Sequence, residues 1–196
     1  MKKSALVAAL LAAAAFAATA APETYVVDPI HSFAYFSIDH LGVSNVRGRF
    51  NKSSGKFTMD SAAKTGSVEM VIDTASVDTG DNDKGSRPRS RDEHLRSADF
   101  FNVAEFPQMS YKSTSVKFNG DVPAEVDGQL TLLGVTKPVA LKIERWVCKD
   151  HPMRKKPMCG GDASATLKRT DFGMKYGVPG IGDEVRLTIN IEAYKQ

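Results

Sequence analysis

The side chains with the greatest capacity for chemistry are four histidines and two aspartates near them in sequence: His31, His40, His94, His151, Asp28 and Asp92. Imidazole and carboxylate groups are common metal ligands and general acids or bases. A metal site needs three or four ligands that converge, and the chain has neither an H-E-x-x-H nor an H-x-H motif. It also has no G-x-S-x-G turn and no phosphate-binding loop. We therefore expect no metal site, and we favour structural histidines that hydrogen-bond at strand ends.

The N-terminal segment indicates the compartment in which these residues operate. Lys2 and Lys3 precede an apolar, alanine-rich run over residues 6–18, and Ala18-Thr19-Ala20 fits a cleavage site between small residues. This pattern is typical of a secretory signal peptide, and the apolar run is too short to span a bilayer comfortably. We predict a signal peptide over residues 1–20 and a single domain over residues 21–196. The expected location is the periplasm, with full secretion as the alternative.

Charge excludes some classes of partner. Without Lys2 and Lys3 the 26 basic residues fall to 24, against 23 acidic residues. A chain this close to neutrality offers no general argument for nucleic acid or for an anionic membrane surface. No apolar run after residue 20 is long enough to cross a membrane. We expect no nucleic-acid partner and no membrane-spanning segment.

The two cysteines are Cys148 and Cys159. Because an exported protein meets an oxidising compartment, this close pair is best interpreted as a disulfide that closes a local loop, over residues 148–161. The spacing is neither C-x-x-C nor C-x-x-C-H, so a redox motif and covalent haem are not expected. Lys149, His151 and residues 154–156 give this loop a basic tip, which we interpret as a solvated surface, with weak attraction to an anionic group as the alternative.

Most of the chain alternates between apolar and polar residues with the period of two that β-strands show. Residues 67–73 and 185–193 are clear examples. One segment differs: Leu95, Ala98 and Phe101 recur at helical spacing, which predicts one short amphipathic helix over residues 91–103, ended by Phe106-Pro107. About eight strands joined by hairpin-like turns indicate an antiparallel barrel or sandwich, and near-sequential hairpins favour an up-and-down barrel.

A barrel of this size either fills its interior with side chains or holds one small apolar ligand. The residues expected to face inward carry no charge. If the fold brought His31, His40, Asp92 and His94 together at one end of the barrel, they would form a hydrolytic or other catalytic site. An exposed Phe33 and Tyr35 permit a homodimer.

Several blocks of sequence, in a fixed order, resemble the YceI-like family. The first begins with Asp28-Pro29-x-His31-Ser32 and continues to Gly48-x-Phe50, and the central block contains Arg91-Asp92-x-His94-Leu95. Further matches are Gly134-Val135-Thr136-Lys137-Pro138 and Arg169-x-Asp171-Phe172-Gly173. The resemblance covers essentially the whole domain.

This resemblance implies an all-β, eight-stranded antiparallel, lipocalin-like up-and-down barrel covered by one short helix. It also implies a non-enzymatic binding protein that carries or sequesters a polyisoprenoid, quinone-type or other long lipid, with no other cofactor. His31, Arg91, Asp92 and His94 then become structural anchors. The predicted lipid-binding residues are Ala34, Phe36, Ile38, Met70, Ile72, Leu95, Phe100, Phe101, Met109, Tyr111, Leu130, Leu132, Leu141 and Ile143.

Overall fold

Alternating apolar and polar side chains form eleven antiparallel strands in the computed structural model, which describes residues 21–196. The predicted signal peptide lies outside the described residues. The first six strands are β1 (Glu23–Val27), β2 (Phe33–His40), β3 (Ser44–Phe50), β4 (Ser53–Asp60), β5 (Thr65–Asp73) and β6 (Val77–Asp78). The other five are β7 (Gln108–Asn119), β8 (Val122–Leu132), β9 (Val135–Asp150), β10 (Pro157–Lys168) and β11 (Ile181–Lys195). The helical elements are α1 (Arg91–Arg96) and two 3-10 turns, η1 (Thr74–Ser76) and η2 (Arg169–Phe172).

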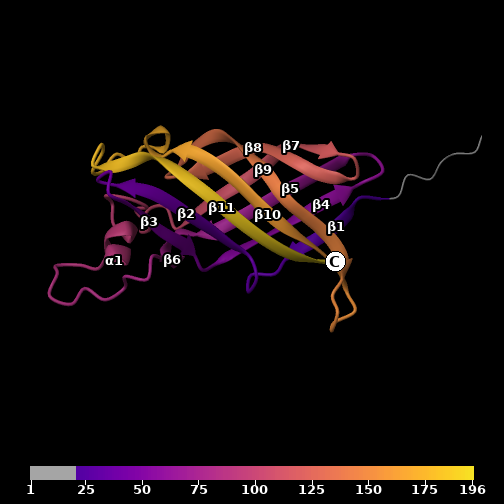
Figure 1. Cartoon of the computed structure of the whole chain (residues 1–196), viewed down its shortest axis with the longest axis horizontal. Coiled ribbons are helices and arrows are strands. Elements are labelled where there is room, and N and C mark those ends of the chain that lie inside the picture. Colours follow the sequence, from indigo (N-terminus) through magenta and orange to yellow (C-terminus); the bar gives the residue numbers. More distant parts are fainter. Residues whose placement is uncertain (1–20) are drawn as a thin grey trace, which may run out of the picture.

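The sheet closes on itself. Its strand order is β1-β4-β5-β7-β8-β9-β10-β11, and β11 pairs again with β1, where Tyr25 lies opposite Lys195. The remaining strands β2, β3 and β6 extend in that order from β11, toward the end of the barrel that carries α1 (Figure 1). The prediction of an all-β, eight-stranded antiparallel barrel with one short helix is confirmed. Among residues 21–196, no helix has the length and apolar character needed to cross a membrane.

Three neighbouring strands of this barrel are interrupted. β1 pairs with β4, and β2, the next strand along the chain, pairs with β3, which also pairs with β6. β4 pairs with β5 in turn. The pairs β1 and β2, β3 and β4, and β5 and β6 therefore each act as one barrel strand with a break in it. Counted this way, the chain runs up and down around the ring. Buried polar groups satisfy the backbone at the breaks: the Ser53 hydroxyl donates to Ser32 O at 2.9 Å, and the Thr74 hydroxyl donates to Phe106 O at 2.7 Å.

The helix is shorter than its apolar spacing predicts. α1 ends at Arg96, so the prediction of a helix over residues 91–103 is wrong beyond that point. The Ser97 backbone is extended, and both its N–H and its hydroxyl donate to His94 O, which stops the helical hydrogen-bond pattern. The turns that follow bury Phe100 and Phe101, two adjacent side chains that one helical face could not bury together.

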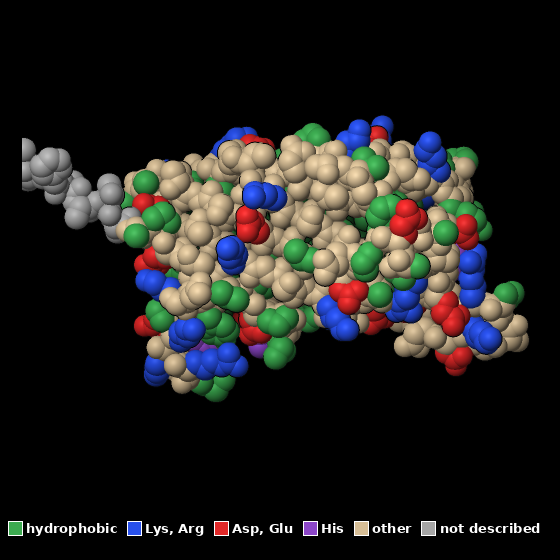
Figure 2. All heavy atoms as spheres, turned by 180° about the vertical axis from the view of Figure 1, so that it is seen from behind, with side chains coloured by type: hydrophobic (Ala, Val, Ile, Leu, Met, Phe, Trp, Pro, Cys, Tyr) green, Lys and Arg blue, Asp and Glu red, His purple; other side chains and the backbone are tan. Residues whose placement is uncertain are grey.

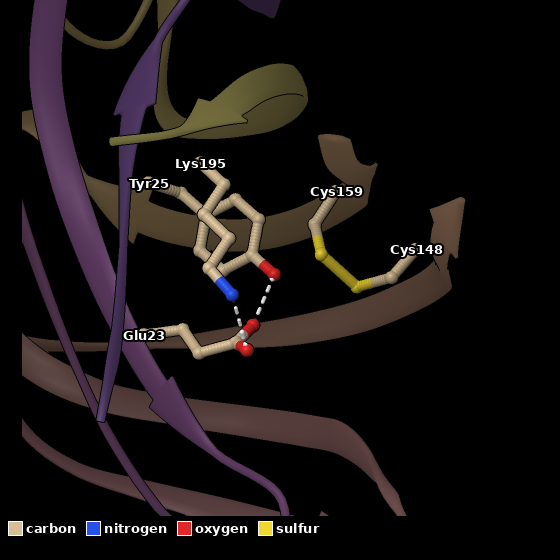
Figure 3. The surroundings of a disulfide bond; sticks show 5 residues. All are labelled: Glu23, Tyr25, Cys148, Cys159 and Lys195. Atoms are coloured by element: carbon tan, nitrogen blue, oxygen red, sulfur yellow. Dashed lines mark hydrogen bonds and ion pairs between the residues drawn. A yellow bond between two sulfur atoms is a disulfide. The ribbon is translucent and has the colours of Figure 1, made fainter. Parts of the chain in front are cut away.

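The cysteine loop is also more regular than expected. β9 continues to Asp150 and β10 begins at Pro157, so the two strands form one long hairpin instead of an excursion over residues 148–161. Cys148 and Cys159 are direct partners in this ladder, with Cα atoms 4.0 Å apart, and they form the predicted disulfide (Figure 3). We call residues 148–159 the disulfide hairpin. Figure 2 shows lysine and arginine side chains gathered at this projecting hairpin, at the lower left.

Candidate functional site

The barrel interior contains a large apolar cavity. This central cavity encloses about 1080 Å³ of space between atoms, part of it open to solvent. Nearly all of its surface is apolar, and it lies among the inward-facing residues of most strands. Ten of the fourteen predicted lipid-binding residues line it: Ala34, Phe36, Met70, Ile72, Phe101, Met109, Tyr111, Leu130, Leu132 and Leu141. Some space therefore remains between the inward-facing side chains.

Glycines on neighbouring strands keep this space open. A Cβ atom at Gly55 would lie 2.4 Å from Met70 Sδ, and one at Gly128 would lie 2.4 Å from Tyr111 Cζ. Real Cβ atoms do not approach other atoms so closely. The Met70 and Tyr111 side chains can therefore lie flat against the barrel wall only because residues 55 and 128 are glycines.

Tyr111 adds no free polar group to the cavity. Its hydroxyl is within hydrogen-bonding distance of two backbone carbonyls, Val126 O at 2.9 Å and Val139 O at 3.0 Å. Burial raises the pKa of this hydroxyl far above its ordinary value, so it remains a neutral donor. A ligand in contact with Tyr111 therefore meets the aromatic ring and no unsatisfied polar atom.

A second, outer cavity continues from the central one toward α1. It encloses about 830 Å³, part of it open to solvent, and shares its lining residues Phe36, Phe101, Arg169, Met174 and Val185 with the central cavity. It also contains predicted lipid-binding residues that the central cavity lacks: Ile38, Leu95 and Phe100. We call the boundary that these shared residues form between the two spaces the neck.

The polar side chains that line the outer cavity are two arginines and two histidines: His40, Arg91, His94 and Arg169. No Asp or Glu side chain lines it. Two acidic residues that are not part of the lining pair with these groups: Asp81 lies 3.6 Å from Arg91, and Asp99 lies 2.9 Å from His94. Hydrogen bonds from Arg89 and then His94 keep the pKa of Asp99 below its ordinary value. An apolar chain in the central cavity could therefore end in a space that favours an electronegative or anionic group.

Arg169 contradicts the expectation that no charge faces the interior. It is only 2% exposed, and it lines both cavities at their neck. Its guanidinium donates to three backbone carbonyls, Gly182 O at 2.7 Å, Ile181 O at 3.0 Å and Met174 O at 3.1 Å. Burial lowers its pKa. The side chain thus holds together the loop before β11 while its charge lies beside the ligand space.

A third, lower cavity lies toward the end of the barrel that carries the disulfide hairpin, and it encloses about 660 Å³ of space between atoms, part of it open to solvent. It shares Val68, Leu141, Ile189 and Ile191 with the central cavity, and it includes the predicted residue Ile143. All fourteen predicted lipid-binding residues thus line one of the three cavities. Phe57 and Trp146, which were not among the predicted residues, also line the lower cavity, and their rings pack edge to face with centroids 5.2 Å apart.

The disulfide hairpin meets the start of the chain at this end. The Tyr25 hydroxyl donates to Glu23 at 2.6 Å, and Lys195 donates to the same carboxylate at 2.6 Å (Figure 3). Burial, together with this hydrogen bond, raises the pKa of Tyr25 to about 12. Tyr25, Phe57 and Cys159 belong to one buried cluster, so this end of the barrel is firmly packed.

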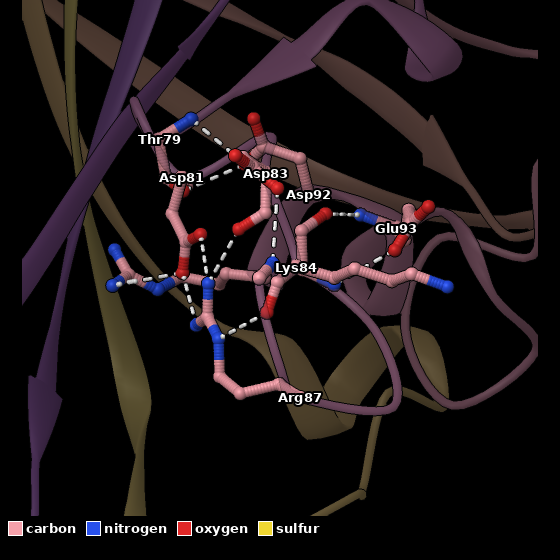
Figure 4. Close-up of polar contacts among 10 residues, drawn as sticks. Thr79, Asp81, Asp83, Lys84, Arg87, Asp92 and Glu93 are labelled. Carbon is pink, nitrogen blue, oxygen red and sulfur yellow. Dashed lines mark hydrogen bonds and ion pairs between the residues drawn. The ribbon is translucent and has the colours of Figure 1, made fainter.

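The expected anchors tie α1 to its surroundings in different ways. Asp92 is 1% exposed and accepts hydrogen bonds from the Thr79 amide at 3.0 Å and the Thr79 hydroxyl at 2.6 Å (Figure 4). Ser90 and Glu93 form a capping box, in which each side chain accepts from the other residue's amide. Arg96 donates to the backbone carbonyls before β6 and within it. These contacts hold α1 in place over the outer cavity, which Arg91, His94 and Leu95 of this helix line.

The residues of the catalytic alternative are not gathered at one place. His40 and His94 line the outer cavity, whereas Asp92 is committed to Thr79. His31 binds Asp28 at 3.0 Å and lies just before β2, roughly 25 Å along that strand from His40. His31 therefore anchors the turn after β1 and not the helix. Within residues 21–196, no group of three or more His, Cys, Asp or Glu side chains could hold a metal ion.

The fold and cavity define a class: closed antiparallel barrels with an elongated apolar interior. Comparison with known sequences identifies the family within it. Residues 25–193 match the YceI-like domain, and the chain belongs to this family. A UPF0312 protein of Pseudomonas aeruginosa is 40% identical over 200 residues, covering all of both chains. Protein YceI of Escherichia coli is 40% identical over 167 residues, covering 85% of this chain and 83% of its own.

Solved structures show the same fold. The Campylobacter jejuni YceI protein superposes with a TM-score of 0.67 at 26% identity, covering 81% of this chain and 90% of its own. A polyisoprenoid-binding domain from Saccharophagus degradans superposes with a TM-score of 0.63 at 18% identity, covering 88% of this chain and 98% of its own. At that identity the second likeness concerns the fold alone.

Proposed function

We propose that this protein holds the long apolar chain of a lipid, of the polyisoprenoid or quinone type, in its barrel and acts as an exported carrier or sequestering protein. The observation that carries the proposal is the central cavity, which is apolar over nearly its whole surface and shares lining residues with a further cavity toward each end of the barrel. Membership of the YceI-like family supports it, as does the fold shared with a domain named for polyisoprenoid binding.

The energetics suit a chain molecule. Each buried methylene contributes about 0.8 kcal/mol, so about ten of them are sufficient for roughly micromolar affinity. The cavities follow one another along the barrel, which fits an elongated ligand better than a compact one. The cationic outer cavity would receive the polar end of the lipid, and the lower cavity would receive the far end of a long chain.

The direct test is extraction of native protein, purified without detergent, into organic solvent, followed by mass spectrometry. We expect about one long apolar lipid per chain. If no lipid is extracted, and the protein binds no fluorescent lipid, the proposal is wrong.

Two phenylalanine substitutions provide a matched comparison. Ala34→Phe places a ring in the central cavity, whereas Ala140→Phe places the same ring on an exposed position of β9. We expect bound lipid to fall at least several-fold for Ala34→Phe only. Equal lipid content in the two variants, both folded by circular dichroism, would contradict binding inside the barrel.

Export is tested separately. The mass of the mature protein should correspond to cleavage after Ala20, and cell fractionation should place it in the periplasm or the medium. An uncleaved, cytoplasmic chain would contradict this part of the proposal.

A further inference from the structure

Four large apolar side chains are exposed side by side at the α1 end of the barrel. Leu41 and Val43 lie in the turn between β2 and β3, and Tyr176 and Val178 lie in the loop before β11. Val43 is 85% exposed. The two loops are adjacent, because the Leu41 amide donates to Gly180 O at 2.7 Å. We call these four residues the apolar rim.

The apolar rim borders the outer cavity. His40 and Ile181, which line this cavity, are register partners and adjoin the two loops. The Tyr176 ring packs on His94 and Phe100, which also line it, with centroid distances of 5.0 and 5.3 Å. A lipid that passes between the outer cavity and its surroundings at this border therefore passes beside the rim.

The charge on this face is mixed at the rim and positive just inside it. Lys175 lies in the loop before β11, and the exposed Asp39 carboxylate accepts a hydrogen bond from the Gly42 amide, beside Leu41, at 2.9 Å. Just inside, the outer cavity presents His40, Arg91, His94 and Arg169 and no acidic side chain. Single exposed apolar side chains are ordinary, but four on adjacent loops with a cation among them match the pattern of a surface that enters a lipid interface.

We propose that the apolar rim inserts into the surface of a membrane that contains anionic lipids, so that the outer cavity faces the bilayer and a lipid passes between membrane and barrel without crossing water. The inference rests on the proposed lipid-carrier function and names the partner of the same cavity. We name a bilayer as the partner because the rim borders a largely apolar space, and because the outer cavity beside it is lined by Arg91 and Arg169 and by no acidic side chain.

The disulfide hairpin is the competing membrane-facing surface, since its tip combines Met153, which is 84% exposed, with the basic residues 154–156. It lies beside the end of β11, whereas the apolar rim adjoins the start of that strand, about 45 Å away along the chain. Substitutions at the two ends therefore separate the two orientations.

The experiment measures sedimentation of the full mature protein with vesicles of phosphatidylcholine and phosphatidylglycerol in equal parts, and with vesicles of phosphatidylcholine alone. The test variant is Leu41→Asn with Val43→Asp, because Asn tolerates the left-handed conformation of residue 41, at φ 61°. The matched control is Ile30→Asp, which removes a 70% exposed apolar side chain from the turn after β1. Met153→Asp tests the disulfide hairpin.

We expect wild-type protein to bind the anionic vesicles and the rim variant to bind about tenfold more weakly, while Ile30→Asp and Met153→Asp bind as the wild type does. Lys175→Gln should lower binding about fivefold, because one cation near an anionic surface contributes that much. All variants should retain the circular dichroism spectrum of the wild type.

Three results would overturn the inference: no vesicle binding by the wild type, loss of binding in Met153→Asp but not in the rim variant, or a rim variant that converts a dimer to a monomer in light scattering. The last would make the rim a contact between two copies. Lipid extracted from the same wild-type preparation distinguishes the two proposals. Bound lipid without vesicle binding removes only the rim inference, whereas an empty barrel removes the carrier function.

Discussion

The Phe36 ring lies directly over Gly48, its partner in the β2–β3 ladder, and a Cβ atom at residue 48 would come within 2.5 Å of Phe36 Cζ. Phe36 lines both the central and the outer cavity. Because Gly48 has no Cβ atom, the Phe36 ring can lie against the wall at the neck between the two cavities.

Gly48→Ala should push Phe36 into the neck. Overpacking of this kind costs about 1–3 kcal/mol of stability, and we expect less extractable lipid as well. The double variant Phe36→Leu with Gly48→Ala should recover part of both losses, since the two atoms nearest to the added Cβ belong to the Phe36 ring. Thermal unfolding and lipid content measure the effect. Simple addition of the two single-variant losses would contradict the proposed contact.

Two neighbouring residues of α1 are expected to have different roles: Leu95 lines the outer cavity, and His94 anchors the helix. Leu95 is an apolar lining residue of the outer cavity, whereas His94 is also held by Asp99 and by the Phe100 and Tyr176 rings. Leu95→Asp places a carboxylate in the lipid path and should reduce bound lipid more than His94→Ala does. Mass spectrometry of extracts from equal amounts of folded protein compares them. The opposite order would mean that α1 acts through its polar contacts.

The disulfide should stabilise the barrel without shaping the central cavity. Cys148 and Cys159 close a short loop, and chain entropy predicts a loss of about 2–3 kcal/mol in the Cys148→Ser, Cys159→Ser variant. Unfolding in denaturant, with wild type in oxidised and reduced form for comparison, measures the loss. Lipid content should be unchanged, because neither cysteine lines a cavity. A large loss of lipid at unchanged stability would contradict this separation.

The Asp28–His31 pair should give the turn after β1 a defined pH window. The hydrogen bond from His31 lowers the pKa of Asp28 below 3.8, and the same bond raises the pKa of His31 above 6.5. The stabilisation through Asp28 is present above pH 3.8 and is lost as the pH falls through its lowered pKa. The stabilisation through His31 is fully present below pH 6.5 and is lost as the pH rises through its raised pKa.

The pair is therefore strongest between about pH 4 and pH 6.5. An NMR titration of the His31 ring measures its pKa, which should fall toward the ordinary value in Asp28→Asn. A His31 pKa that is the same in both proteins would show that the pair does not exist in solution.

Alternation of apolar and polar residues indicated an antiparallel barrel or sandwich and the inward-facing strand residues, because a strand with one buried face repeats every two residues. The resemblance to the YceI-like family selected the eight-stranded barrel. The alternation fails where the backbone changes phase. Ile143 and Arg145 pair with the consecutive residues Ala163 and Asp162, so Glu144 is an extra residue that forms a β-bulge. The bulge turns Trp146 inward, and counting from Ile143 in steps of two misses it.

Arg169 was missed for a different reason. A charged side chain is expected to face water, and its burial requires the carbonyls of Met174, Ile181 and Gly182, which only the folded loop brings to one point. The length of α1 was likewise set by a local competitor, the Ser97 hydroxyl, and not by the apolar spacing. Whether the lining residues bind lipid remains a prediction.

The way in which α1 is attached to the barrel affects how fast a ligand could enter and leave. β6 pairs with β3 but not with β7, and α1 covers this part of the barrel with no place in any strand ladder. It is fastened by the Asp92–Thr79 hydrogen bonds, by Arg96 and by neighbouring turns. Displacing α1 therefore leaves every inter-strand hydrogen bond intact. A ligand could enter or leave at a rate set by local opening, many times during one lifetime of the folded barrel, so hydrogen exchange in residues 90–103 should be faster than in the strands.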